Sequence, residues 1–146
     1  LLDLGANMLA VDNLGRNAFM HSANNNCSVM MDIMLKRTPN FKEMVNHQDN
    51  NGVSTMMILA KRGNREALRV LIARGANPFL KDNRGNMAVD YAIMAGNSTC
   101  KEILQKTQRI YEKANLLEDK IARETYLKTA LGEFAKHNRV ENSCVK

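Results

Sequence analysis

The sequence has few of the residues that build a disulfide scaffold, a zinc site or a membrane span. Its 146 residues include three cysteines, two prolines and no tryptophan. Cys27, Cys100 and Cys144 are odd in number and form no Cys-x-x-Cys or Cys/His cluster. We therefore expect neither a disulfide framework nor a zinc site, and a reducing, cytoplasmic location is the default. No stretch approaches the roughly 20 apolar residues that a transmembrane helix needs.

The motifs of common catalytic and cofactor sites are also missing. The sequence contains no nucleophile elbow, P-loop, dinucleotide fingerprint or metal-ligand spacing. His21, His47 and His137 have no convincing partner cysteine or carboxylate in the sequence. For His47 the simpler interpretation is a hydrogen bond to the backbone. For Asp90 it is a hydrogen bond from an N–H group of a neighbouring loop. We expect a protein that is not an enzyme and that needs no cofactor or metal.

What the chain does have is an internal repeat. Three Asp-to-Gly turns, at residues 12–15, 49–52 and 82–85, each lead into a short apolar segment with the character of a helix. The second turn follows the first by 37 residues, and the third follows the second by 33 residues. A period near 33 fits one turn plus two helices, a unit that buries its apolar face only against its neighbours. The repeat therefore predicts an all-α solenoid.

These blocks resemble the ankyrin repeat, whose unit opens Asp-x-x-Gly-x-Thr-Pro-Leu-His and ends in an aliphatic outer helix followed by Gly-Ala-Asn. Residues 64–78 are similar to that outer helix and return loop almost position by position. The resemblance implies an ankyrin-type helix-turn-helix solenoid over about residues 1–105. Residues 17–20, 54–57 and 87–90 replace the Thr-Pro-Leu-His tetrapeptide. This departure removes the family's usual bonds between neighbouring loops, so we expect lower local stability than in a consensus array.

The same register gives the expected domain boundaries. The array should occupy residues 1–105, with repeats that start near residues 12, 49 and 82. The chain begins inside a repeat, at a partial unit over residues 1–11, and it has no initiator Met. We therefore expect a fragment of a longer protein, with further repeats upstream. After the array we expect a C-terminal helical extension (106–138) and a flexible tail (139–146).

The first complete repeat differs locally from the others. It is longer than the next repeat, and its extra residues fall within 36–44. Pro39 cannot continue a helix there, so we expect Phe41, Met44 and Val45 to fold the longer loop back onto the stack. Asn26 stands where the later repeats have glycine, which predicts a left-handed backbone at that position.

The extension carries a heptad stripe. Apolar or small residues recur in alternating steps of four and three, at Ile103, Thr107, Ile110, Ala114, Leu117 and Ile121. A new apolar face starts at Leu127, so we expect one long helix whose face changes near residue 124, or two helices that meet there. Either the stripe caps the last repeat, or it pairs as a coiled coil with another helix of the parent protein or of a second copy. Both interpretations stay open.

Partner binding is expected on the concave face, the surface that the family resemblance implies. That face is built from the turn tips and the exposed side of each inner helix. Matching positions give the candidate residues Arg16, Asn24, Asn25, Asn50, Asn51, Lys61, Arg62, Lys81, Asn83 and Arg84. Five of these are basic and none is acidic, whereas the whole chain has 21 basic and 15 acidic residues. Charge of one sign steers association, so we expect an acidic or phosphorylated protein or peptide partner. Lys61, Arg62 and Arg84 should matter most.

The leading functional hypothesis is thus a non-catalytic protein-interaction scaffold. Nucleic-acid binding by the same face is one alternative, because the pI is about 9.4, although aromatic residues make up only 5% of the chain. A further alternative is the regulatory segment of a larger enzyme or channel.

Overall fold

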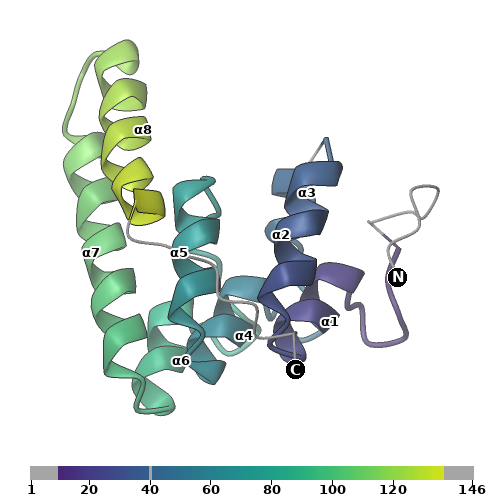
Figure 1. The fold of residues 1–146 in the computed structure, drawn as a ribbon. Coiled ribbons are helices and arrows are strands. Elements are labelled where there is room, and N and C mark those ends of the chain that lie inside the picture. The colour runs from purple at the N-terminus through teal and green to yellow at the C-terminus, as the bar shows by residue number, and fades with distance from the viewer. Residues whose placement is uncertain (1–9, 40, 137–146) are drawn as a thin grey trace.

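The structure is a computed structural model that describes residues 10–39 and 41–136 (Figure 1). Most of the expected partial unit (1–11) and all of the expected tail (139–146) lie outside the described residues. The described residues form helices and no strands, which confirms the all-α prediction. The helices are α1 (Ala18–Asn24), α2 (Ser28–Arg37), α3 (Phe41–Val45), α4 (Thr55–Arg62), α5 (Arg65–Ala73), α6 (Ala88–Met94), α7 (Ser98–Asn115) and α8 (Lys120–Lys136). In this part of the chain, no helix is long and apolar enough to cross a membrane.

The helices stack as pairs in two rows. The pairs are α1 with α2, α4 with α5, and α6 with α7, and the members of each pair contact one another. In the inner row α4 lies between α1 and α6, and in the outer row α5 lies between α2 and α7 (Figure 1). This arrangement is the predicted helix-turn-helix solenoid, in which each pair buries its apolar face against the next.

Small polar residues set where the helices begin. The side-chain oxygen of Asn17 accepts a hydrogen bond from the N–H of Met20 at 2.9 Å, and that of Asn64 accepts one from Ala67 at 3.2 Å. Each bond satisfies a backbone donor that the first turn of a helix leaves unpaired. At α6 the cap is reversed, because Oδ2 of Asp90 accepts from the N–H of Met87 at 2.9 Å. The backbone partner of Asp90 thus belongs to the start of its own helix, and not to the neighbouring loop that was expected.

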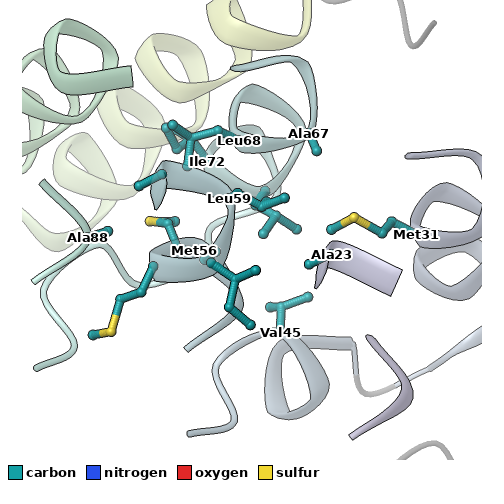
Figure 2. Packing of buried hydrophobic residues seen from close by; sticks show 14 of the residues in the cluster. Ala23, Met31, Val45, Met56, Leu59, Ala67, Leu68, Ile72 and Ala88 are labelled. Carbon is teal, nitrogen blue, oxygen red and sulfur yellow. The ribbon is translucent and has the colours of Figure 1, made fainter. Parts of the chain in front are cut away.

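A continuous apolar core joins the stacked pairs. Figure 2 shows Met56 and Leu59 of α4 lying between Ala88 of α6 and Ala23 of α1. Several of the fully buried side chains are methionines: Met20, Met44, Met56 and Met57. The unbranched thioether adapts to the irregular gaps between repeats, where branched side chains fit less well.

The longer loop of the first complete repeat folds back as predicted. Its residues form the short helix α3, in which Met44 and Val45 are buried in the core and Phe41 packs against it. The side-chain amide of Asn17 donates to the carbonyl oxygen of Met44 at 3.0 Å, inside the protein. Asn26 has a φ of 56°, so the predicted left-handed backbone is also confirmed.

The C-terminal extension is a helical hairpin, and the expected break near residue 124 was placed too late. α7 ends at Asn115 and α8 begins at Lys120. Oδ1 of Asp119 accepts from the N–H of Ile121 at 3.0 Å, which caps α8, and the guanidinium of Arg123 donates to the carbonyl oxygen of Leu117 at 2.8 Å. α8 then packs on α5 and α7 of the same chain. This packing favours the capping interpretation of the extension.

Cys100 is free and buried, and its burial raises the pKa of the thiol.

One buried hydroxyl reflects the missing tetrapeptide. Thr55, which stands in the place of the proline, is fully buried, and within residues 10–39 and 41–136 its Oγ1 has no hydrogen-bond partner. We expect Thr55→Val to raise the free energy of unfolding by about 1 kcal/mol, because it removes an unsatisfied polar group. Thr107→Val is the matched control: its buried hydroxyl donates to the carbonyl oxygen of Ile103 at 2.8 Å, so no gain is expected. Urea unfolding measures both, and equal changes would contradict this assignment.

Candidate functional site

The three Asp-to-Gly tips have the same internal geometry. In each, Oδ1 of the leading aspartate (Asp12, Asp49 or Asp82) accepts hydrogen bonds from the backbone N–H groups two and four residues further on, at 2.8–2.9 Å. The glycine that ends each tip has a positive φ, the conformation that a tight turn requires here. The tips are therefore equivalent building blocks, and their second carboxylate oxygens are left to make other contacts.

Asparagines tie successive tips into one edge, which we call the tip ladder. The backbone N–H and side-chain amide of Asn50 donate to the carbonyl oxygens of Leu14 (3.0 Å) and Asn13 (3.1 Å). Asn83 repeats the pattern one repeat later, donating to Asn51 (2.9 Å) and Asn50 (3.0 Å). These bonds join neighbouring loops. The amides of Asn50 and Asn83 are thus engaged within the array.

His47 adds a further tie between loops. Its Nε2 lies 2.7 Å from the carbonyl oxygen of Gly15, in the previous tip. This contact is the backbone partner expected from the sequence. The side-chain amide of Gln48 similarly donates to the carbonyl oxygen of Lys81, in the following tip, at 2.8 Å.

A cavity of about 520 Å³ opens beside the tip ladder, and we call it the inner groove. Its lining comes from all three complete repeats: Arg16, Asn24, Asp49, Val53, Ile58, Lys61, Arg62 and Tyr91. The volume lies within the range of pockets that hold ligands or partner side chains. The lining combines polar and charged groups with the apolar side chains of Val53 and Ile58.

The inner groove gathers some of the candidate residues and leaves others outside. Arg16, Asn24, Lys61 and Arg62 line it together. The candidates that do not line it are Asn25, Asn50, Asn51, Lys81, Asn83 and Arg84. Of these, Lys81 and Arg84 are exposed at the last tip.

The basic residues of the groove differ in how they are held. Nε of Arg16 lies 3.3 Å from Oδ2 of Asp12, so this guanidinium is paired at the surface. Lys61 and Arg62 occupy the last turn of α4, both exposed, and neither forms an ion pair with another described residue. Cations near a helix C-terminus are stabilised by the helix dipole, which accounts for their position without a ligand. Their free charges nevertheless face one cavity.

Four of the lining residues were not among the candidates from the sequence: Asp49, Val53, Ile58 and Tyr91. The set expected there had no acidic member, whereas Asp49 brings a carboxylate into the groove. The sequence did contain a usable pattern, because Ile58 and Tyr91 each follow a tip aspartate by nine residues. This spacing brings a side chain of the inner helix back toward the tip.

The nine-residue spacing produces a hydrogen bond in two of the three repeats. Nε2 of His21 lies 2.8 Å from Oδ2 of Asp12, and the hydroxyl of Tyr91 donates to Oδ2 of Asp82. Hydrogen bonds from the backbone N–H groups of Arg16 and Leu14 and from His21 lower the pKa of Asp12 to about 2, against the opposing effect of desolvation.

Tyr91 is held in its protonated form. Burial, followed by the hydrogen bond to Asp82, raises the pKa of Tyr91 to about 12, and the negative charges of Asp82 and Asp49 add to the rise. Burial opposes ionisation of Asp82, but the hydrogen bonds from Tyr91 and the backbone outweigh it, so the pKa of Asp82 is lowered. The phenol therefore remains a donor to Asp82 at neutral pH.

Metal binding finds no support in the described part of the chain, where no three His, Cys, Asp or Glu residues are grouped to hold an ion. The groove instead offers cations, amides and one carboxylate, which suit hydrogen-bonded and ionic recognition.

Part of the chain is similar to a known repeat family. Residues 40–92 match the family model described as "Ankyrin repeats (many copies)". A 78-residue stretch, 53% of the chain, is 28% identical to "Start control protein cdc10" of Schizosaccharomyces pombe. The aligned stretch covers 9% of that relative, so the chain spans a small part of the length of the curated protein that it matches.

Proposed function

We propose, from the match of residues 40–92 to the ankyrin-repeat model, that the inner groove binds an acidic or phosphorylated peptide segment of a partner protein. Ankyrin repeats generally mediate protein–protein interaction. We further propose that the module is a non-catalytic scaffold. The activity of the complete protein stays a prediction, including the alternative of a regulatory segment in a larger enzyme or channel.

The observation that supports this proposal is the pair of unpaired cations, Lys61 and Arg62, on the wall of a cavity of about 520 Å³. An arginine fork binds carboxylate or phosphate through two parallel hydrogen bonds, and a neighbouring ammonium adds charge. Asn24 lines the same cavity and offers both a donor and an acceptor for a peptide backbone. The partner contacts proposed here are therefore Arg16, Asn24, Lys61 and Arg62.

Some of the remaining candidates lie outside the lining of the groove. Asn25, Asn51, Lys81 and Arg84 stay predicted contacts for a longer partner that extends beyond the groove. A cytoplasmic location also stays a prediction.

Nucleic-acid binding remains the second interpretation of the basic face. The scarcity of aromatic rings in the groove favours a peptide instead. Tyr91 is the aromatic residue among the groove's lining residues, and its hydroxyl is bonded to Asp82. Single-stranded nucleic acids are generally bound by several exposed aromatic rings, which this face does not offer.

Reversing the charge of the two cations tests the proposal. We expect the double variant Lys61→Glu/Arg62→Glu to bind acidic peptides at least about tenfold more weakly, because two charge-assisted contacts become repulsive. The measurement is fluorescence polarisation with labelled peptides selected from a displayed random library on the wild-type protein. Affinity should also fall as the salt concentration rises.

The chain offers a matched control for this variant. Lys36 and Arg37 are an exposed basic pair in the last turn of α2, on the outer row. The variant Lys36→Glu/Arg37→Glu changes the net charge by the same amount, so it should retain peptide binding. Equal losses in the two variants would mean that overall charge, and not the groove, governs association.

A further inference from the structure

One repeat breaks the pairing that its neighbours share. The residue nine positions after the tip aspartate is His21 in the first complete repeat and Tyr91 in the last, and both bond Oδ2 of their aspartate. In the middle repeat this position is Ile58, which has no polar atom in its side chain. Asp49 therefore lacks the internal donor that Asp12 and Asp82 possess.

The consequence is an available carboxylate oxygen inside the inner groove. Oδ1 of Asp49 is occupied by the N–H groups of Asn51 and Val53, at 2.8 and 2.9 Å. Oδ2 of Asp49 makes no hydrogen bond or ion pair with any residue in 10–39 or 41–136. Asp49 is partly buried and lines the cavity. The negative charge of Asp49 also contributes to the raised pKa of Tyr91, so the carboxylate and the phenol interact electrostatically.

The residues around Oδ2 of Asp49 determine which kind of partner group could bind this oxygen. The apolar side chains of Val53 and Ile58 line the same cavity, and they offer no hydrogen-bond partner to this oxygen. A partly buried carboxylate gains most from a cationic donor, because charge-assisted hydrogen bonds strengthen as solvent is displaced. The lining also includes Lys61 and Arg62, which attract the opposite sign.

We infer that the inner groove recognises a partner segment of mixed charge, in which a lysine or arginine side chain binds Oδ2 of Asp49 and an acidic side chain binds Lys61 and Arg62. This inference rests on the proposed function and specifies the partner more narrowly. A segment that is acidic throughout places a negative charge against Asp49, and a segment that is basic throughout places a positive charge against the α4 cations. Both mismatches disfavour binding, so the two-signed groove selects by repulsion as well as by attraction.

The test compares peptides selected by the wild-type protein and by Asp49→Asn. Asparagine keeps the Oδ1 acceptor that holds the tip and replaces Oδ2 with an amide that cannot pair with a cation. A displayed library of random peptides is panned on each protein, and the selected peptides are sequenced and their affinities measured. The wild type should enrich peptides that carry both signs. For these peptides, Asp49→Asn should bind about 10- to 100-fold more weakly and should lose the enrichment for Lys and Arg while keeping that for Asp and Glu.

A second variant gives Asp49 a hydrogen-bond donor from its own inner helix. Ile58→Tyr gives Asp49 the same donor that Asp82 has in Tyr91, so we expect it to lose the preference for Lys and Arg as well. Ile58→Val is its control, since it keeps an apolar floor and leaves Oδ2 available, and it should select mixed-charge peptides. Circular dichroism and urea unfolding of each variant confirm that the array is folded.

The outcomes separate this inference from the proposed function. Selection of purely acidic peptides by the wild type would overturn the inference and leave the proposed function standing. The same holds if mixed-charge peptides bind equally well to the wild type and Asp49→Asn. A wild type that enriches no peptide would overturn both.

Discussion

Gly52→Ala is expected to lower the free energy of unfolding by about 2–5 kcal/mol, one of the two largest effects that the structure predicts. Gly52 has a φ of +80°, where a side chain costs about 1–2 kcal/mol. An added Cβ would also lie 2.8 Å from the backbone N of Asn83 and 2.8 Å from Cα of Asp82. Both atoms are backbone, so the next tip must shift, which adds about 1–3 kcal/mol of overpacking. Urea or thermal unfolding measures the loss.

Gly85→Ala is the control that isolates contact between tips. Gly85 has a similar φ of +84°, but a Cβ added there would have no neighbouring atom within 4 Å. Its substitution should therefore cost only the conformational part, about 1–2 kcal/mol. Equal losses for the two variants would show that the tips do not press on one another as the ladder requires.

The same displacement should reach the binding surface. A shifted tip at Asn83 weakens its hydrogen bonds to Asn50 and Asn51, which align successive repeats. Asp82 and its partner Tyr91 move with that tip, and Tyr91 lines the inner groove. We therefore expect Gly52→Ala to weaken peptide binding even under conditions in which it stays folded, whereas Gly85→Ala should not.

The fold was predictable because its determinants are local and periodic. An aspartate that caps a tip and a glycine that closes it are both visible in the sequence, and their spacing fixes the repeat. Part of the lining was named in advance: the repeat register assigns Arg16 to a turn and Lys61 and Arg62 to the end of an inner helix, and all three line the groove. The role of Asp49 was not predictable from the sequence. It depends on the absence of a hydrogen-bond donor in the side chain of Ile58, nine residues later, and on the neighbouring repeats that complete the cavity.

The end of the array was harder to read. Residues 116–119 contain no glycine or proline, so nothing in their composition marks a break between α7 and α8. The turn is stabilised by the cap at Asp119 and by the docking of α8 on α5, a contact between segments far apart in the sequence. A heptad stripe alone does not reveal whether its partner is another chain or the next helix of the same one.

Phe134→Ala is expected to cost about 3–5 kcal/mol at this docked helix, the second of the two largest effects. Phe134 is 7% exposed and belongs to the continuous core, and Nζ of Lys106 lies 5.8 Å from the centre of its ring. Because α8 packs on α5 and α7, the loss should fall mainly on the attachment of α8. Hydrogen exchange should show faster exchange of the α8 amides, while the amides of α4 stay protected.

Ile121→Ala, in the first turn of the same helix, provides the comparison. Its side chain is 73% exposed, so truncation removes little buried surface and should leave exchange in α8 nearly unchanged. Sedimentation of the wild type then distinguishes the two interpretations of the extension. If α8 caps its own array, the wild type is monomeric, and Phe134→Ala exposes apolar surface on α5 and α7 that promotes association. If the helix pairs with a second copy, the wild type is dimeric and the substitution dissociates it, which would contradict the capping interpretation.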